Sequence, residues 1–156
     1  MCIRDSGIAV RWRVGGVTMN QNYVHTITLY NRIRAADRPD RKEHWQRTVL
    51  RDCFWKATTN TSFGDKEANV SNTYVVRIPK SERYVPYHVF VKSPDGHFTV
   101  SQGDIVVHGE CSDEITGEAG KTAAQLIERY RPEAFRVTAF SDNTAFPVDK
   151  HYRLGG

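Results

Sequence analysis

The chain has 156 residues and a formal net charge of +4 at pH 7, with 22 Lys and Arg residues against 18 Asp and Glu residues. This length suits a single domain with a substantial core, and an aromatic content of 11% argues against global disorder. No apolar run approaches the roughly 18–20 residues that a membrane-spanning helix needs, so we expect no membrane segment.

The first 18 residues are predicted to be a non-native or disordered extension. Residues 1–6, MCIRDS, resemble a recurrent translated adapter artefact, and Met19 precedes NQNYVHTITLY, which favours an opening strand. The alternative is a genuine basic N-terminal arm. Omitting residues 1–18 removes three arginines and one aspartate and leaves 19 basic against 17 acidic residues. The resulting net charge of +2 is too small to indicate nucleic-acid binding. With residues 1–18 set apart as an extension, we expect a single β-barrel domain over residues 19–156.

Two strands are predicted at the start of the domain, Tyr23–Asn31 and His44–Lys56. In the second strand, alternation places Trp45 and Trp55 on one face, and apolar residues on both faces are typical of a central strand. The segment between the strands, RIRAADRPDRKE at 32–43, is charged and interrupted by a proline, which predicts a solvated loop. The alternative function of this loop is a basic contact surface.

Residues 57–72, ATTNTSFGDKEANVSN, form the least typical segment of the chain. The segment is rich in Thr, Asn and Ser, and it contains Gly64-Asp65, which is a turn signal. A polar segment of this length between two strands is either a flexible functional loop or a hairpin. We predict a long, protruding polar hairpin loop at 57–72.

Two further strands, Thr73–Pro79 and Tyr84–Lys92, lead to a tight turn at 93–98. The segment SQGDIVVHGE at 101–110 then combines a turn with a short buried strand. Its Gly-Asp pair favours a turn, because the Asp104 carboxylate can accept hydrogen bonds from nearby backbone amides. Three β-branched residues follow and favour an extended backbone.

A helix is predicted at Glu118–Tyr130, where apolar residues recur at helical spacing. Pro132 ends it, and strands at 135–140 and 148–154 close the domain. Several strands, one helix and two more strands favour a mainly β fold. We predict a small antiparallel β-barrel or sandwich with one inserted α-helix at about 118–130, not a doubly wound α/β sheet.

Motifs that carry chemistry are incomplete in this sequence. TGEAGKT at 116–122 lacks the first glycine of a phosphate-binding loop, so we interpret it as a helix N-terminus. The His and Cys residues match no common zinc spacing, and neither a nucleophile elbow nor HExxH is present. We expect no enzyme activity, catalytic residue, cofactor, metal or small-molecule substrate. Cys53 and Cys111 show no disulfide pattern, which favours a reducing cytoplasm.

A single-stranded nucleic-acid-binding barrel is the alternative function. Such proteins combine exposed aromatic rings with basic side chains on neighbouring strands. The residues that would form this surface are Tyr74, Arg77, Lys80, Arg83, Tyr84 and Tyr87. The simpler interpretation is that these tyrosines lie between core and surface, as tyrosines often do.

Five stretches form a pattern together: the Trp45–Trp55 strand, the polar loop after it, TYVVRIP at 73–79, GDIVVHGE at 103–110, and Asp142-Asn143 with HYRLGG at 151–156. This pattern resembles the small head–tail connector proteins of tailed bacteriophages, the head-completion or stopper class, and related minor capsid proteins. The resemblance covers residues 22–156. The predicted helix departs from the plainest stopper barrels, so stopper, adaptor-adjacent and tail-completion proteins all remain open.

The resemblance implies a ring-forming virion subunit that helps to close the DNA-filled head and to dock the tail. Its expected partners are further copies of itself, portal or adaptor proteins, tail proteins, and genomic double-stranded DNA passing through the channel. Its expected location is the virion, and the host cytoplasm before assembly. The candidate channel or interface residues are Thr58, Thr59, Asn60, Ser62, Phe63, Asp65, Lys66 and Asn69. The candidate inter-subunit contacts are Arg34, Arg38, Arg41 and Lys42.

Overall fold

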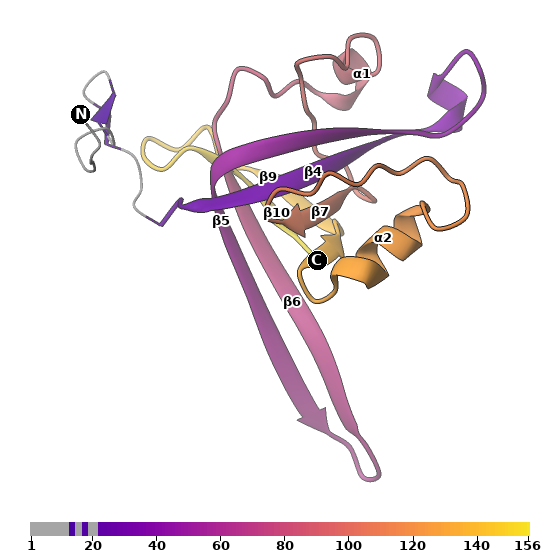
Figure 1. Ribbon diagram of the computed structural model, residues 1–156. Helices are drawn as coiled ribbons and strands as arrows, with labels where there is room; N and C mark the ends of the chain where they lie inside the picture. Colours follow the sequence, from indigo (N-terminus) through magenta and orange to yellow (C-terminus); the bar gives the residue numbers. More distant parts are fainter. Residues whose placement is uncertain (1–12, 15–16, 19–21) are drawn as a thin grey trace, which may run out of the picture.

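The computed structural model describes residues 13–14, 17–18 and 22–156. Its main part is one antiparallel seven-stranded sheet that curls into a half-barrel, with little helix (Figure 1). The predicted mainly β, barrel-like fold is confirmed. Arg13–Val14 (β2) and Val17–Thr18 (β3) pair with each other in a separate ladder. The rest of the predicted N-terminal extension lies outside the described residues.

The strands follow the order β8-β7-β4-β5-β6-β10-β9 across the sheet. Their bounds are His25–Ile33 for β4, His44–Phe63 for β5, Ala68–Pro79 for β6, Ile105–His108 for β7, Ala134–Arg136 for β8, Ala139–Asp142 for β9 and His151–Gly155 for β10. The helical segments are a 3-10 turn at Ala35–Asp37, α1 at Tyr87–Phe90 and α2 at Ala123–Tyr130.

Two hydrophobic clusters stabilise the fold, one on each face of the sheet. The interior cluster gathers side chains from most of the strands, including Trp55, Tyr74, Phe98, Phe135 and Leu154. The outer cluster lies where α2 covers β7, β4 and β8, and it includes Tyr30, Ile105, Val107, Cys111 and Leu126. Burial of this apolar surface is the main source of stability.

A bulge at Asp52 changes the face that β5 presents to the interior. Asp52 has a φ of 57°, and the pairing register between β4 and β5 shifts at this point. Leu50 and Cys53 are therefore both buried, although simple alternation would place them on opposite faces. The prediction that Trp45 and Trp55 share a face is wrong: Trp45 packs against the outer cluster, and Trp55 belongs to the interior cluster.

Strands β8 and β9 are the two edges of the sheet, yet they are consecutive in the chain. Val137 accepts a hydrogen bond from the Gly103 amide (2.9 Å) and donates one to the Asp104 carbonyl (2.7 Å), which extends the β7 pairing. The next residue, Thr138, donates to the Gly155 carbonyl (2.9 Å) beside β10. The predicted strand at 135–140 is thus split by a bend, and segment 134–142 joins the two edges of the half-barrel.

The predicted strand Tyr84–Lys92 is wrong, because this segment contains helix α1. Pro86 is the residue before the helix, where its fixed φ is tolerated and its missing N–H is no loss. Within the described residues, the strand pairing of Tyr84 is limited to an isolated bridge with Phe98.

Helix α2 begins later than predicted, at Ala123 instead of Glu118. Gly117 and Gly120 have φ values of 85° and 82°, so the segment before the helix has a left-handed backbone conformation at these residues. Thr122 is the N-cap: its hydroxyl accepts a hydrogen bond from the Gln125 amide, and the Gln125 side chain accepts one from the Thr122 amide. The interpretation of TGEAGKT as a helix N-terminus is confirmed for its last residue, Thr122, whereas residues 116–121 precede the helix.

Replacing Thr122 by alanine is expected to lower the free energy of unfolding by about 1 kcal/mol, because the capping hydroxyl is lost. Urea unfolding followed by circular dichroism measures this change. Ser112→Ala is the control, since Ser112 is an exposed residue in the preceding loop. Equal effects of the two substitutions would contradict a stabilising cap.

Candidate functional site

Strands β5 and β6 leave the body of the protein as a long two-stranded arm, which we define as residues 57–73 (Figure 1). The ladder between β5 and β6 continues without interruption to the pair Phe63↔Ala68, and a turn closed by a Gly64 to Glu67 hydrogen bond (2.9 Å) ends it. Every residue of the arm is exposed. The segment thus protrudes as a hairpin, as predicted, but the predicted long loop is corrected: the two strands stay paired up to Phe63↔Ala68, and a short turn joins them.

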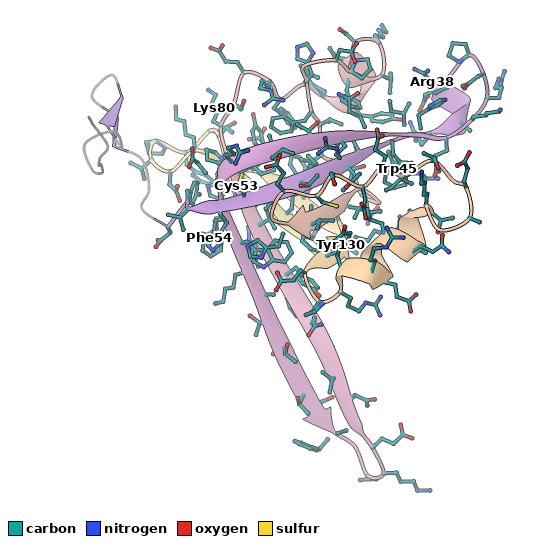
Figure 2. All side chains as sticks on the ribbon, in the orientation of Figure 1. Arg38, Trp45, Cys53, Phe54, Lys80 and Tyr130 are labelled. Carbon is teal, nitrogen blue, oxygen red and sulfur yellow. The ribbon has the colours of Figure 1, made fainter. Side chains whose placement is uncertain are left out.

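The predicted candidate residues of this segment all lie on the arm. The side chains of the arm point to two opposite faces of the hairpin (Figure 2). Because side chains alternate along a strand, pairs such as Thr61↔Val70 and Phe63↔Ala68 share one face. This face continues the face of the buried pair Trp55↔Val76, and we call it the interior-continuing face. Its residues are Ala57, Thr59, Thr61, Phe63, Ala68, Val70 and Asn72.

The opposite face of the arm, which we call the polar face, carries hydroxyl and amide groups only. Its residues are Thr58, Asn60, Ser62, Asn69, Ser71 and Thr73. By contrast, the interior-continuing face exposes two large apolar side chains, Phe63 at 83% and Val70 at 66%. The arm is therefore amphipathic, and its apolar side has no partner among the described residues.

The charges of the arm are few. Asp65, Lys66 and Glu67 lie together in the turn, and they give residues 57–73 a net charge of −1. Proteins that hold nucleic acid neutralise phosphates with several Lys and Arg side chains. The arm is thus better suited to contact protein than to bind DNA tightly.

Aromatic residues hold the root of the arm. The Trp55 ring stacks on His108 at 4.8 Å between centroids, and the Tyr74 ring stacks on Phe135 at 4.7 Å. Tyr74 also pairs through its backbone with Gly156, accepting a hydrogen bond (3.3 Å) and donating one (2.8 Å). A side chain at position 156 would overlap the Phe135 ring. These contacts fix the direction in which the arm leaves the body.

The predicted basic contacts lie in the loop 34–43, far from the tip of the arm (Figure 1). Arg34 is engaged within the chain: its guanidinium binds Asp37 at 2.9 Å and lies 4.8 Å above the Tyr87 ring. The Tyr87 hydroxyl donates to Asp37 (2.7 Å) and, with Arg34, holds the pKa of this carboxyl below its usual range. Arg41 and Lys42 are exposed and form no ion pair with any described residue.

Arg38 differs from Arg41 and Lys42, because its Nε is buried and has no hydrogen-bond partner in the described part of the chain. The four predicted contact residues thus share one loop without forming one charged surface. Among the described residues, the loop offers Arg41 and Lys42 as exposed cations without an ion pair, Arg34 bound to Asp37 and Tyr87, and Arg38 with a buried, unpartnered Nε.

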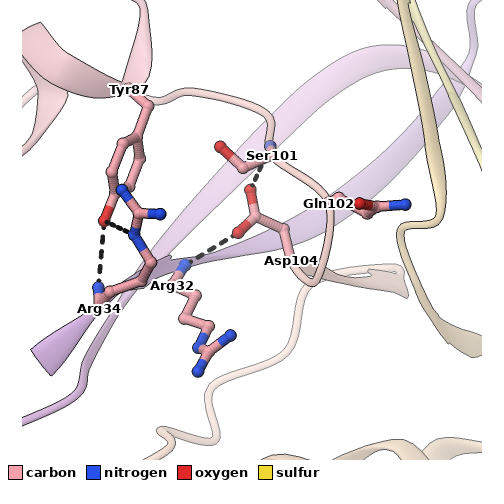
Figure 3. A pocket seen from close by; sticks show the side chains of 6 residues that line it. All are labelled: Arg32, Arg34, Tyr87, Ser101, Gln102 and Asp104. Carbon is pink, nitrogen blue, oxygen red and sulfur yellow. Dashed lines mark hydrogen bonds between the residues drawn. The ribbon is translucent and has the colours of Figure 1, made fainter.

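A pocket of about 160 Å³ lies beside this loop and is lined by Arg32, Arg34, Tyr87, Ser101, Gln102 and Asp104 (Figure 3). The Asp104 carboxylate accepts hydrogen bonds from the amides of Arg32 (3.0 Å) and Ser101 (2.8 Å) and from the Asn31 side chain (2.8 Å). The sequence predicted the amide contacts of this Gly-Asp turn, and they are present. Because the chain itself occupies its acceptors, Asp104 joins β4 to the turn before β7 and has a structural role.

Burial raises the pKa of Asp104 to about 6, although its three hydrogen bonds favour the charged form. The ordinary value is 3.8, so between about pH 4 and 6 the folded state holds a proton that the unfolded chain has released. The free energy that protonated Asp104 adds to folding is therefore fully present below about pH 4. This free energy is lost as the pH rises through 6, by up to about 3 kcal/mol.

The Asp104→Asn variant is therefore expected to become more stable relative to the wild type between about pH 4 and 7, by up to about 3 kcal/mol. Asparagine has no charge to bury, so its cost does not change over this range. Urea unfolding of both proteins at the two pH values measures the difference. A stability difference that is independent of pH would contradict a raised pKa.

The aromatic residues of the nucleic-acid alternative do not gather on one exposed surface. Tyr74 is buried in the interior cluster, and Tyr84 stacks on Tyr152 at 4.2 Å between centroids. Tyr87 contacts Arg34, and the Arg77 guanidinium lies 5.1 Å from the Phe54 ring. These rings are used by the fold, so they offer no continuous stacking platform for bases.

The predicted cysteines are both free and buried, and burial raises the pKa of the Cys53 thiol to about 12. His108 lies 2.6 Å from Glu133 through its Nδ1. Within the described residues, no three His, Cys, Asp or Glu side chains are grouped so as to hold a metal ion.

Sequence reasoning missed one exposed apolar feature, the segment 139–148 from β9 into the following loop, which we call the apolar segment. Phe140, Phe146 and Val148 are 37%, 59% and 76% exposed. Within the described residues, β9 pairs with β10 on one side only, so its outer backbone edge is open. The available signal was Phe146 within the predicted connection at 141–147, with Phe140 and Val148 at the ends of the predicted strands that flank it.

No helix in the described ranges combines the length and apolar character that crossing a lipid bilayer requires.

Comparison with known proteins identifies the family. No curated protein and no solved structure matches the chain. A family model described as "Family of unknown function (DUF6751)" matches residues 22–156. Since this match covers most of the chain, the protein belongs to the DUF6751 family.

Proposed function

We propose that this protein is a virion structural protein of a tailed bacteriophage, a ring-forming subunit at the head–tail joint. In this function it helps to close the DNA-filled head and to dock the tail. The phage assignment rests on the resemblance of the Trp45–Trp55 strand, the 73–79 and 103–110 stretches and the C-terminal HYRLGG to connector proteins. The assembly function rests on the arm.

The single observation that carries the proposal is the exposure of the arm over its whole length. A two-stranded hairpin alone in water is only marginally stable, and its open edges favour pairing with another chain. At ~3.3 Å per residue, the arm reaches roughly 20 Å beyond its root. Such a projection is suited to contact a neighbouring subunit in an assembly.

The loop 34–43 is the second proposed contact, made with the neighbouring ring. Arg41 and Lys42 are available for this contact, because they are exposed and unpaired among the described residues.

The weak charge of the arm also fits a channel, since a strongly basic lumen would bind DNA too tightly for the DNA to slide.

Co-expression of the full chain with the products of its neighbouring genes tests the proposal. A defined complex with a portal, adaptor or tail protein, seen by purification and size-exclusion chromatography, is the expected result. The opposing result is a chain that captures none of these proteins and instead binds single-stranded DNA with strong salt dependence. In that case the nucleic-acid alternative would replace the connector proposal.

A further inference from the structure

We infer that the interior-continuing face of the arm docks on the apolar segment 139–148 of a second copy of this chain, along the open edge of β9. The inference deepens the proposed function, on which it rests for the ring, because it names the two surfaces that join one subunit to the next. The proposed contact residues are Phe63 and Val70 on the arm, and Phe140, Phe146 and Val148 on the neighbouring copy.

Hydrophobic complementarity is the first argument. Phe63 and Val70 are the large apolar residues of an otherwise polar and nearly neutral arm, and both are mostly exposed. The apolar segment exposes large side chains as well. Contact between the two surfaces would remove both sets of apolar side chains from water, which is favourable.

The open strand edges provide the second argument. Among the residues that the structure describes, β5 and β6 pair along the arm only with each other, because the pairing of β5 with β4 ends at Cys53 and that of β6 with β10 begins at Val75. Within the same residues, strand β9 has an open edge too. Two open edges on one chain allow a strand of one copy to extend the sheet of another.

The apolar side chains of both surfaces lie on the interior side of the sheet. Phe140 stands opposite Leu154, which is fully buried in the interior cluster, so Phe140 lies on the interior side of β9. Phe63 and Val70 lie on the face that continues the interior side of β5 and β6. An arm placed along the edge of β9 therefore brings all three side chains to the same side of the extended sheet.

The geometry requires a second copy. The tip of the arm and the loop between β9 and β10 lie at separate ends of the molecule (Figure 1), and the aromatic root fixes the direction of the arm. One chain cannot bring its own two surfaces together. Contact between two different surfaces of identical subunits is head-to-tail, and such contacts close into rings when the rotation permits.

Disulfide trapping between two proteins that each carry one added surface cysteine tests the inference. One full-length chain carries Phe63→Cys and the other Phe146→Cys, both in a Cys2→Ser background in which the remaining Cys53 and Cys111 are buried. Oxidised glutathione is the oxidant. The expected result is a mixed disulfide dimer in clear excess over either homodimer. Val70→Ser in the first chain should remove most of this dimer.

The matched control places the cysteine on the polar face, as Ser62→Cys, next to Phe63 and equally part of the exposed arm. It should give little mixed dimer. Equal trapping through both faces, or arm-to-arm homodimers of the Phe63→Cys chain as the main product, would overturn the inference. So would the absence of any mixed dimer, both for the isolated chains and in the co-expressed complex.

The two experiments separate the inference from the proposed function. A complex with portal or tail proteins that lacks the Phe63–Phe146 cross-link overturns the inference and leaves the connector function standing. A strong cross-link in a chain that captures none of these proteins retains the docking between copies and overturns the connector function.

Discussion

Replacing Trp55 by alanine is expected to lower the free energy of unfolding by about 3–5 kcal/mol. Trp55 is only 8% exposed, and its ring contacts His108, Tyr74 and Phe135 at the root of the arm. Truncation would leave a cavity in the interior cluster and would remove aromatic contacts that add to the energy of burial. Because single domains are stable by only about 5–15 kcal/mol, the variant should be marginally stable. Urea unfolding followed by circular dichroism measures the loss.

Trp45→Ala is the matched control on the same strand. Trp45 is half-buried, packs against the outer cluster, and donates a hydrogen bond from its indole nitrogen to Glu43 (2.9 Å). Less apolar area is lost here, so we expect less than half of the loss caused by Trp55→Ala. Similar losses for the two variants would contradict the assignment of the tryptophans to different clusters.

Local patterns in the sequence predicted much of the sheet. Alternating apolar residues located β4 and most of β5, because the side chains of a half-buried strand point alternately to core and solvent. The Gly-Asp turn at 103–104 was predicted with its amide contacts, since glycine and aspartate have specific backbone preferences. These features depend on neighbouring residues, so a single sequence contains the necessary information.

Features that depend on distant partners were not predicted. The bulge at Asp52 exists because β5 must match the register of β4, and an aspartate within a strand does not by itself specify an extra position. The bend between β8 and β9 depends on two different neighbours, β7 and β10. By contrast, Pro86 did signal a helix start, but we interpreted it as a bend within the predicted strand Tyr84–Lys92.

The sequence located the candidate site but did not predict its structure. The composition of 57–72 indicated a polar projection, and alternation gave no signal for strands, because both faces of the arm are in contact with water. The ladder became visible only with the pairing of β5 and β6. The amphipathic character of the arm follows from that register, which explains why Val70 was absent from the predicted contacts and Phe63 was included without a special role.

Shortening the arm is expected to abolish assembly while leaving the body folded. Replacing residues 59–72 by Asn-Gly joins the paired residues Thr58 and Thr73 through a two-residue turn of the type that hairpins favour. The removed side chains are all exposed, so the free energy of unfolding should change by no more than about 1 kcal/mol. Circular dichroism and urea unfolding measure stability, and size-exclusion chromatography of the co-expressed complex measures assembly.

A full-length arm with changes on its polar face alone, Asn60→Thr and Asn69→Thr, is the control and should assemble normally. Loss of assembly in the shortened chain but not in this control would assign the function to the interior-continuing face, which carries Phe63 and Val70. Normal assembly of the shortened chain would remove the arm from the proposed function. Unfolding of that chain would show that the arm stabilises the body, contrary to the exposure of all its residues.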